Sequence, residues 1–184
     1  MFLLSGQEMA THNACPAECP REPLVVAPMR MMNFLELKIP PLVVAFIFAV
    51  GMWLLSLLAP SFQMMTSIRV ALAVVLVLAG IGIALAGVVS FRRASTTVNP
   101  VSPGAATSLV SAGIYAFTRN PMYLGFLLGL SGWAVYLSNA AAFLALPFFV
   151  LYLNRFQIAP EERALQTLFG GEFSAYRGRV RRWI

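Results

Sequence analysis

The chain has 184 residues, of which 59% are hydrophobic and only 11% are charged, and its formal net charge is +6. A soluble domain normally carries about a quarter of charged residues, so this composition excludes an ordinary soluble domain. The basic excess is spread among apolar segments and forms no separate basic domain, which argues against nucleic acid as a partner. We expect an all-α integral membrane protein, because in lipid a spanning segment must satisfy its own backbone hydrogen bonds.

The first 31 residues differ from the rest of the chain. They contain His12, Cys15 and Cys19, which are the only histidine and the only cysteines, in a polar, proline-rich setting. Three potential ligands of this kind are weak evidence for a metal site, and we predict none. We interpret residues 1–31 as a disordered extension or a misassigned start, since several methionines stand just before the apolar pattern begins. Residues 32–184 then form a single membrane domain.

Four apolar blocks follow in chain order, over residues 39–58, 68–89, 122–137 and 140–156. A helix needs about 20 apolar residues to cross the hydrocarbon layer, with about 17 as a working minimum. The first two blocks exceed this length, and the last two lie near it with only two residues between them. The sequence therefore predicts about four transmembrane helices, of which the last two form a tight hairpin.

Basic residues predict the orientation of these helices. With four spans, Lys38, the arginines between the second and third spans, and those that follow the fourth all fall on one face. The opposite face has only Arg69, in a short connection. By the positive-inside rule the arginine-rich face is cytoplasmic, with both termini and the active site on that side. Anionic membrane lipids are expected partners of this face.

The connection between the second and third blocks, residues 91–123, is long, polar and nearly uncharged, and it ends in Arg119-Asn-Pro-Met-Tyr123. Connections of this length are usually functional or disordered. Pro121 stands where the third helix begins, and Asn120 is a candidate N-cap. Free backbone amides at this point, beside Arg119, favour an anionic group such as a carboxylate.

After the last span, Pro160 is expected to begin a helix that Gly170 and Gly171 end. The residues beyond it alternate apolar side chains at helical spacing with arginines. This pattern is typical of an amphipathic tail at the membrane interface, in which the arginines from Arg177 to Arg182 serve as surface anchors.

Two adjacent acids, Glu161 and Glu162, follow the last span directly. They lie just beyond the membrane among arginines, where a cationic ligand could meet them. The alternative is that they pair with Arg163 or Arg155 on a hydrated surface, which would contribute little to stability.

Together these residues resemble the isoprenylcysteine carboxyl methyltransferase family, over about residues 33–184. The resemblance rests on Arg119-Asn-Pro-Met-Tyr-x-Gly125, on Glu161-Glu162, and on the tail that ends in Arg182-Trp183. The chain is also similar to the phospholipid N-methyltransferases, which share that membrane architecture. The resemblance implies an enzyme that binds S-adenosylmethionine on the cytoplasmic side. It would methylate a lipophilic acceptor that enters from the bilayer: a prenylated cysteine carboxylate, a phospholipid amine, or a small hydrophobic acid or thiol.

The resemblance also implies which residues bind the cofactor. Asn120, Pro121 and Tyr123 match the family's cofactor element, with asparagine at a position where the family often has histidine. Gly80-Ile-Gly82 matches a Gly-x-Gly of the phospholipid branch, although small residues in membrane helices are usually packing surface. We interpret the stripe Gly125, Gly129 and Gly132 as packing surface.

The remaining assignments pair charges. Glu161 and Glu162 match the paired acids of the phospholipid branch and suit the cofactor's amino and ribose groups. The cofactor's carboxylate suits Arg119 or the amides near Asn120. A carboxylate acceptor needs no general base, whereas an amine or thiol must lose a proton. Glu161, Glu162 and Tyr123 are therefore the candidate catalytic residues.

Two alternatives remain open at this point. A membrane reductase of related architecture would bind a nicotinamide cofactor at a similar pocket, but the 2′-phosphate of NADP would need several basic residues where the sequence has paired acids. A non-catalytic bundle that binds lipid would have no use for Glu161 and Glu162.

Overall fold

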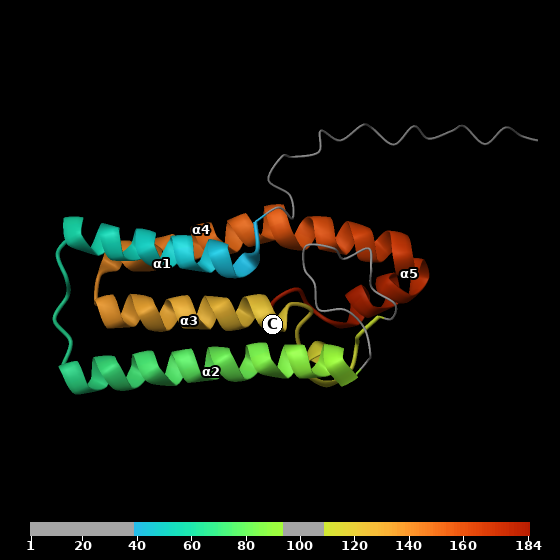
Figure 1. Cartoon of the computed structure of the whole chain (residues 1–184), viewed down its shortest axis with the longest axis horizontal. Coiled ribbons are helices and arrows are strands. Elements are labelled where there is room, and N and C mark those ends of the chain that lie inside the picture. Colours follow the sequence, from blue (N-terminus) through green and yellow to red (C-terminus); the bar gives the residue numbers. More distant parts are fainter. Residues whose placement is uncertain (1–38, 94–108) are drawn as a thin grey trace, which may run out of the picture. The chain divides into compact units, whose positions relative to one another are not determined.

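The structure, a computed structural model, describes residues 39–93 and 109–184, which all fall within one compact unit. In these residues all regular secondary structure is helical. Four helices lie side by side (Figure 1): α1 (Pro41–Leu58), α2 (Thr66–Arg93), α3 (Pro121–Leu137) and α4 (Ala140–Leu153). A short 3-10 helix, η2 (Gly113–Ala116), precedes α3, and a π-helical turn, η3 (Asn154–Ile158), joins α4 to α5 (Ala159–Arg179). The predicted all-α membrane architecture is confirmed, and the predicted extension over residues 1–31 lies outside the described residues.

The lengths of the helices fit the predicted spans. By length and composition α1, α2 and the continuous 40-residue stretch Ala140–Arg179 can cross a membrane, and α3 is a shorter apolar helix of 17 residues. A helix rises about 1.5 Å per residue, so the part of this stretch before Gly170, where α5 bends, extends about 45 Å, more than the roughly 30 Å hydrocarbon layer. The charged second half of that stretch, α5, therefore lies outside the membrane.

Small residues bring α2 and α3 together as an antiparallel pair. A Cβ atom at Gly80 would lie 2.5 Å from the carbonyl oxygen of Gly125, and one at Gly132 would lie 2.8 Å from that of Ala73. Helices in lipid associate through close backbone approach of this kind, because lipid tails remove the hydrophobic driving force between them. The packing interpretation holds for Gly80, Gly125 and Gly132, whereas a Cβ at Gly129 would meet nothing within 4 Å.

The predicted tight hairpin of α3 and α4 is confirmed, with Ser138 and Asn139 as its turn. Ser138 adopts the left-handed conformation, with φ 48°. The Asn139 side chain caps α4 by accepting a hydrogen bond from Ala141 N at 2.9 Å, and its Nδ2 donates to Ala59 O at 2.6 Å. Ser138 O accepts from Phe62 N at 2.8 Å. These bonds hold the connection between α1 and α2 against the hairpin turn.

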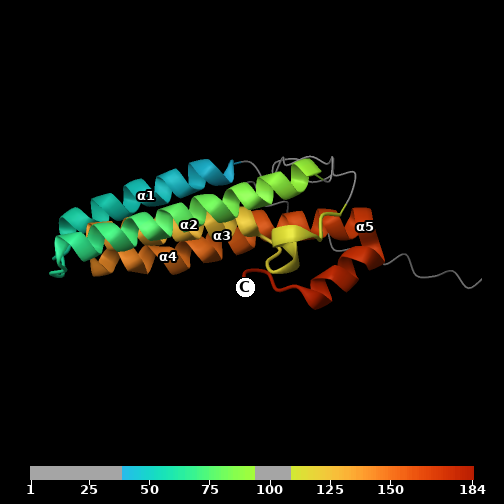
Figure 2. The same cartoon turned by 90° about the horizontal axis from the view of Figure 1, so that it is seen from below.

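The passage from α4 to α5 differs from the prediction. Pro160 lies in the first turn of α5, as predicted, but the π turn carries the backbone from α4 into α5 without the break that a new helix would have. Ala159 N donates to Asn154 O, five residues back, and in this wider turn the missing N–H of Pro160 disrupts no α-helical bond. The predicted helix end is found at Gly170, whose φ of 47° bends α5. Figure 2 shows the second half of α5 turning back toward the bundle.

The amphipathic tail packs on the protein at its main apolar positions. Phe173 and Tyr176 are buried, and the Tyr176 hydroxyl donates to Tyr115 O at 2.7 Å. The indole N–H of Trp183 donates to Asn154 Oδ1 at 3.1 Å. These three side chains therefore contact the bundle, because the bend at Gly170 directs them onto it, and the interfacial location of the tail stays a prediction.

Candidate functional site

Three segments far apart in the sequence meet where α3 begins. They are the residues before and within the first turn of α3, the first turn of α5, and the last residues of the chain. The bend at Gly170 makes this meeting possible, because it returns the tail to the start of α3 (Figure 2). The predicted site residues at these three places are therefore neighbours in space.

Glu161, which is partly buried, pairs with the buried Tyr123. The Tyr123 hydroxyl donates a hydrogen bond to Glu161 Oε1, and Tyr123 is only 4% exposed. Burial raises the pKa of Glu161 to about 8; the hydrogen bond from Tyr123 acts in the opposite direction, and the charge of Glu162 adds to the increase. At neutral pH Glu161 therefore holds a proton that it can release in a mildly alkaline medium.

Glu162 is held by two arginines. Arg182 binds it with both ends of its fork, from Nη2 to Oε2 at 2.6 Å and from Nε to Oε1 at 3.1 Å. Arg119 Nη1 lies 3.2 Å from Glu162 Oε1. Bidentate pairs of this kind are strong and directional. Arg182, which the sequence predicted as a surface anchor, is thus part of the site.

Arg119 is a cation of this site whose hydrogen bonds are incomplete. Its side chain is 10% exposed, and its Nε has no hydrogen-bond partner among the described residues. Its Nη1 is in ion-pair contact with Glu162 but lacks hydrogen-bond geometry. Burial lowers the pKa of Arg119, and Glu162 opposes that effect. Since a buried N–H without a partner is costly, this position suits an anionic ligand group such as a carboxylate or phosphate.

Asn120 has a different role from the predicted one. Its side chain makes no capping bond to α3; Nδ2 donates to Arg182 O at 2.9 Å instead. Next to it, Arg119 N donates to Arg181 O at 3.1 Å, and the buried Thr118 hydroxyl accepts from Asn120 N at 3.2 Å. The capping prediction is wrong because the returning tail offers this amide a carbonyl acceptor, so Asn120 holds the tail in place.

Pro121, Gly80 and Gly82 lie at the edge of these contacts or outside them. Pro121 is buried at the start of α3 and packs against Gly87, where a Cβ would lie 3.1 Å from Pro121 Cγ. Gly80 belongs to the contact with Gly125, and Gly82 lies on an exposed face where a Cβ would meet nothing within 4 Å. The structure therefore gives Gly80 a packing role and Gly82 an exposed position, and the cofactor role of both stays a prediction.

The sequence analysis missed several members of the site. Thr118, Tyr115 and Tyr176 are buried, and burial raises the pKa of both tyrosines, that of Tyr176 to about 12. All three therefore act as neutral hydrogen-bonding groups. The signal that could have identified Arg182 is its place in the tail motif that ends in Trp183, because that motif lies far from the membrane blocks yet belongs to the resemblance.

Comparisons with known proteins give the family. The family described as phospholipid methyltransferase matches the chain over residues 68–172, more than half of its length and from α2 into α5. An uncharacterized protein of Haemophilus influenzae is 46% identical over 63 residues, which are 34% of this chain and 100% of that protein. No solved structure matches the chain. Since the matched range includes Arg119, Tyr123, Glu161 and Glu162, the chain belongs to the phospholipid methyltransferase family.

Proposed function

We propose that this membrane methyltransferase takes its methyl group from S-adenosylmethionine and transfers it to a lipophilic acceptor that enters from the bilayer. One observation carries this proposal: two adjacent, partly buried acids stand at the end of an apolar bundle, one bound by Tyr123 and the other by two arginines. Clustered polar groups with shifted pKa values in an apolar setting are typical of active sites.

The side chains present fit this cofactor. When bound, S-adenosylmethionine supplies a methyl group on a positively charged sulfur. The unpaired Nε of Arg119 suits its carboxylate, and Glu161 and Glu162 suit its amino and ribose groups. Tyr123 orients Glu161, and Asn120 holds the tail that carries Arg182.

Of the acceptors that the sequence leaves open, a phospholipid amine has the most support. An amine must lose a proton before or during methylation, and the ionised form of Glu161, which becomes the main form above its pKa of about 8, is a candidate to receive it. The family description points to the same substrate class. A prenylated cysteine carboxylate, or a small hydrophobic acid or thiol, is the competing substrate for the isoprenylcysteine branch.

The expected orientation places this site in the cytoplasm. All charged residues of the site lie at the start of α3 and in α5 and its tail, the face that the positive-inside rule assigns to the cytoplasm. The family match does not support the alternative of a nicotinamide-dependent reductase. The burial of Glu161 costs desolvation free energy, and a non-catalytic bundle would gain nothing in return for that cost.

Calorimetric titration of the detergent-purified protein with S-adenosylmethionine tests this proposal. We expect binding by the wild type and by Glu172→Gln, a control on the exposed face of α5, and binding weakened at least about tenfold in Glu161→Gln/Glu162→Gln. Glutamine keeps the shape and one hydrogen-bonding oxygen, so the variant retains most of its packing. Absence of binding by the wild type, in detergent and again in lipid nanodiscs, would refute the proposed cofactor.

A further inference from the structure

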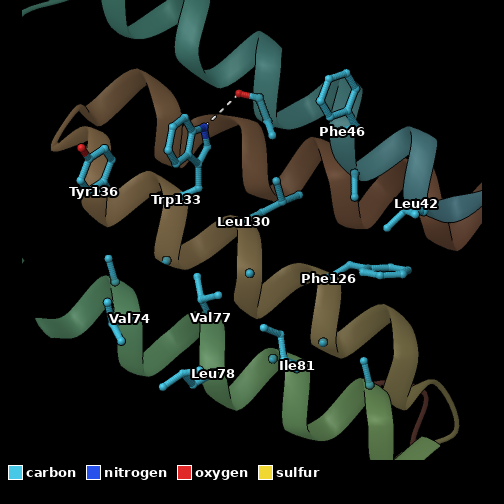
Figure 3. Close-up of a pocket in the computed structure, with 18 of the residues that line it drawn as sticks. Leu42, Phe46, Val74, Val77, Leu78, Ile81, Phe126, Leu130, Trp133 and Tyr136 are labelled. Atoms are coloured by element: carbon cyan, nitrogen blue, oxygen red, sulfur yellow. Dashed lines mark hydrogen bonds between the residues drawn. The ribbon is translucent and has the colours of Figure 1, made fainter. Parts of the chain in front are cut away.

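An apolar groove of about 990 Å³ runs along α3, between α1 and α2. These two helices stand on either side of α3 (Figure 1), and Figure 3 shows the groove with Leu42 and Phe126 at one end and Val74 and Tyr136 at the other. From Gly125 to Tyr136 the lining extends over 12 residues of α3, about 17 Å. The groove therefore covers roughly half of the hydrocarbon layer.

The lining of the groove offers no obvious polar group to a ligand. Its residues are aliphatic, aromatic or glycine. The indole N–H of Trp133 is already used, because it donates to Ala49 O at 3.0 Å (Figure 3). At the far end, the ring of Tyr136 lies 5.7 Å from the guanidinium carbon of Arg69. A groove of this chemistry accepts a hydrocarbon chain and penalises a polar ligand.

The groove leads to the candidate functional site along one side of α3. Tyr123, Phe126 and Leu130 follow each other at spacings of three and four residues, which places them on one face of the helix. Phe126 and Leu130 line the groove, and Tyr123 donates to Glu161. All three also belong to or contact the same hydrophobic cluster. A chain in the groove would therefore point with its cytoplasmic end toward Phe126, one helical turn from Tyr123.

We propose that this groove binds the hydrocarbon chain of the methyl acceptor, with the acceptor's head group at Tyr123 and Glu161. This inference rests on the proposed function. The rims of the groove face the lipid, since Phe46 is 68% and Leu78 62% exposed, so a chain can enter sideways from the bilayer. A helix of a second copy is the competing occupant, and the oligomeric state tests it.

Two glycines provide a matched pair of variants. A Cβ at Gly129 or at Gly82 would meet nothing within 4 Å, so a larger side chain is accommodated at either position. Gly129 lines the groove, and Gly82 lies on an exposed face outside it. Gly129→Phe therefore fills the groove, and Gly82→Phe adds the same ring where the bilayer receives it.

The experiment uses photo-crosslinking in nanodiscs with two probes, phosphatidylethanolamine and S-farnesylcysteine, each with a diazirine midway along its hydrocarbon chain. Mass spectrometry locates the adducts. We expect at least one probe to label the α3 segment around Phe126 and Leu130, with labelling reduced roughly tenfold or more in Gly129→Phe and unchanged in Gly82→Phe. The probe that labels identifies the chain as acyl or isoprenoid.

Equal labelling of wild type and Gly129→Phe by both probes, or labelling only outside the groove, would overturn the inference. A dimer in light scattering that Gly129→Phe dissociates would do the same, because a second copy would then occupy the groove. Titration of the same samples with S-adenosylmethionine distinguishes a failure of the proposed function from a failure of the inference about the groove. Groove labelling without cofactor binding would refute the proposed function and leave the groove as a lipid site without a methyl acceptor, and cofactor binding without groove labelling would refute the inference alone.

Discussion

Replacing Arg182 by alanine removes one of the two cations that hold Glu162 and loosens the tail at the start of α3. Arg182 makes the bidentate contact at 2.6 and 3.1 Å, and its carbonyl oxygen accepts from Asn120. The backbone contact survives the substitution, so the tail is weakened but not released. Glu162 keeps Arg119 as its remaining partner, at 3.2 Å.

The size of the effect of Arg182→Ala follows from how far the ion pair between Arg182 and Glu162 is buried. Truncating one partner of a buried charge pair costs about 2–5 kcal/mol. Glu162 is 13% exposed, but Arg182 is 34% exposed and Arg119 remains, so solvent screening and the second cation reduce the loss. We expect the ion pair to lose about 1–2 kcal/mol, which corresponds to an affinity for S-adenosylmethionine that is weaker by up to about 5- to 30-fold.

Calorimetric titration measures this affinity in Arg182→Ala, Arg182→Lys and Arg181→Ala. Lysine restores the charge but not the fork, so its affinity should fall between those of wild type and Arg182→Ala. Arg181 has an exposed side chain and contributes its backbone carbonyl to Arg119, so its replacement should leave affinity unchanged. Wild-type affinity in Arg182→Ala, or equal losses in Arg182→Ala and Arg181→Ala, would refute the positioning role of the fork.

Three further predictions concern stability. The pKa of Glu161 is about 8 in the folded chain and near 4.5 when unfolded. Between pH 4.5 and pH 8 the folded chain therefore binds more protons at Glu161 than the unfolded chain does. This contribution is complete below pH 4.5 and is lost as the pH rises toward 8, so the melting temperature of wild type should fall relative to Glu161→Gln over this window; a constant difference would contradict the raised pKa. Gly80→Val should lower the free energy of unfolding by at least about 1–3 kcal/mol, and with it the melting temperature, because its Cβ would lie 2.5 Å from Gly125 O. Gly82→Val is the control, and equal melting temperatures of the two would show that α2 and α3 do not approach so closely. Asn139→Ala removes the cap of α4 and the hydrogen bond to Ala59 O, and should lower the free energy of unfolding, measured with a chemical denaturant, by about 1–2 kcal/mol. An unchanged free energy would indicate that Asn139 does not hold the connection between α1 and α2 against the hairpin turn.

Much of the fold was predictable because the membrane restricts it. Block lengths identified the spans, and two residues between the last blocks left room only for a tight turn. The uninterrupted passage through Pro160 was not predictable, because it depends on one wide turn in which Ala159 bonds to Asn154. In the sequence, a proline at this position is compatible both with the start of a new helix and with a continuous passage through a wide turn.

The candidate site was predictable in its acids and its α3 segment, and not in its tail. Glu161, Tyr123 and Arg119 stood out by chemistry and resemblance, and the structure brings them to neighbouring contacts. Arg182 reaches Glu162 only because α5 bends at Gly170 toward the start of α3. A glycine in the sequence indicates that the chain can bend there, but not in which direction it continues. Asn120 was misassigned for the same reason, since its acceptor is a carbonyl of that tail.

The most direct test of the central proposal is transfer of a labelled methyl group from S-adenosylmethionine to lipid by the protein in nanodiscs. Nanodiscs of phosphatidylethanolamine, and in parallel nanodiscs supplemented with S-farnesylcysteine, offer the two main acceptor classes. The proposed function predicts label in the extracted lipid with wild type and with Glu172→Gln, and its loss in Glu161→Gln/Glu162→Gln. Label that stays on the cofactor with both acceptors and with a total membrane lipid extract would contradict methyl transfer to a lipophilic acceptor.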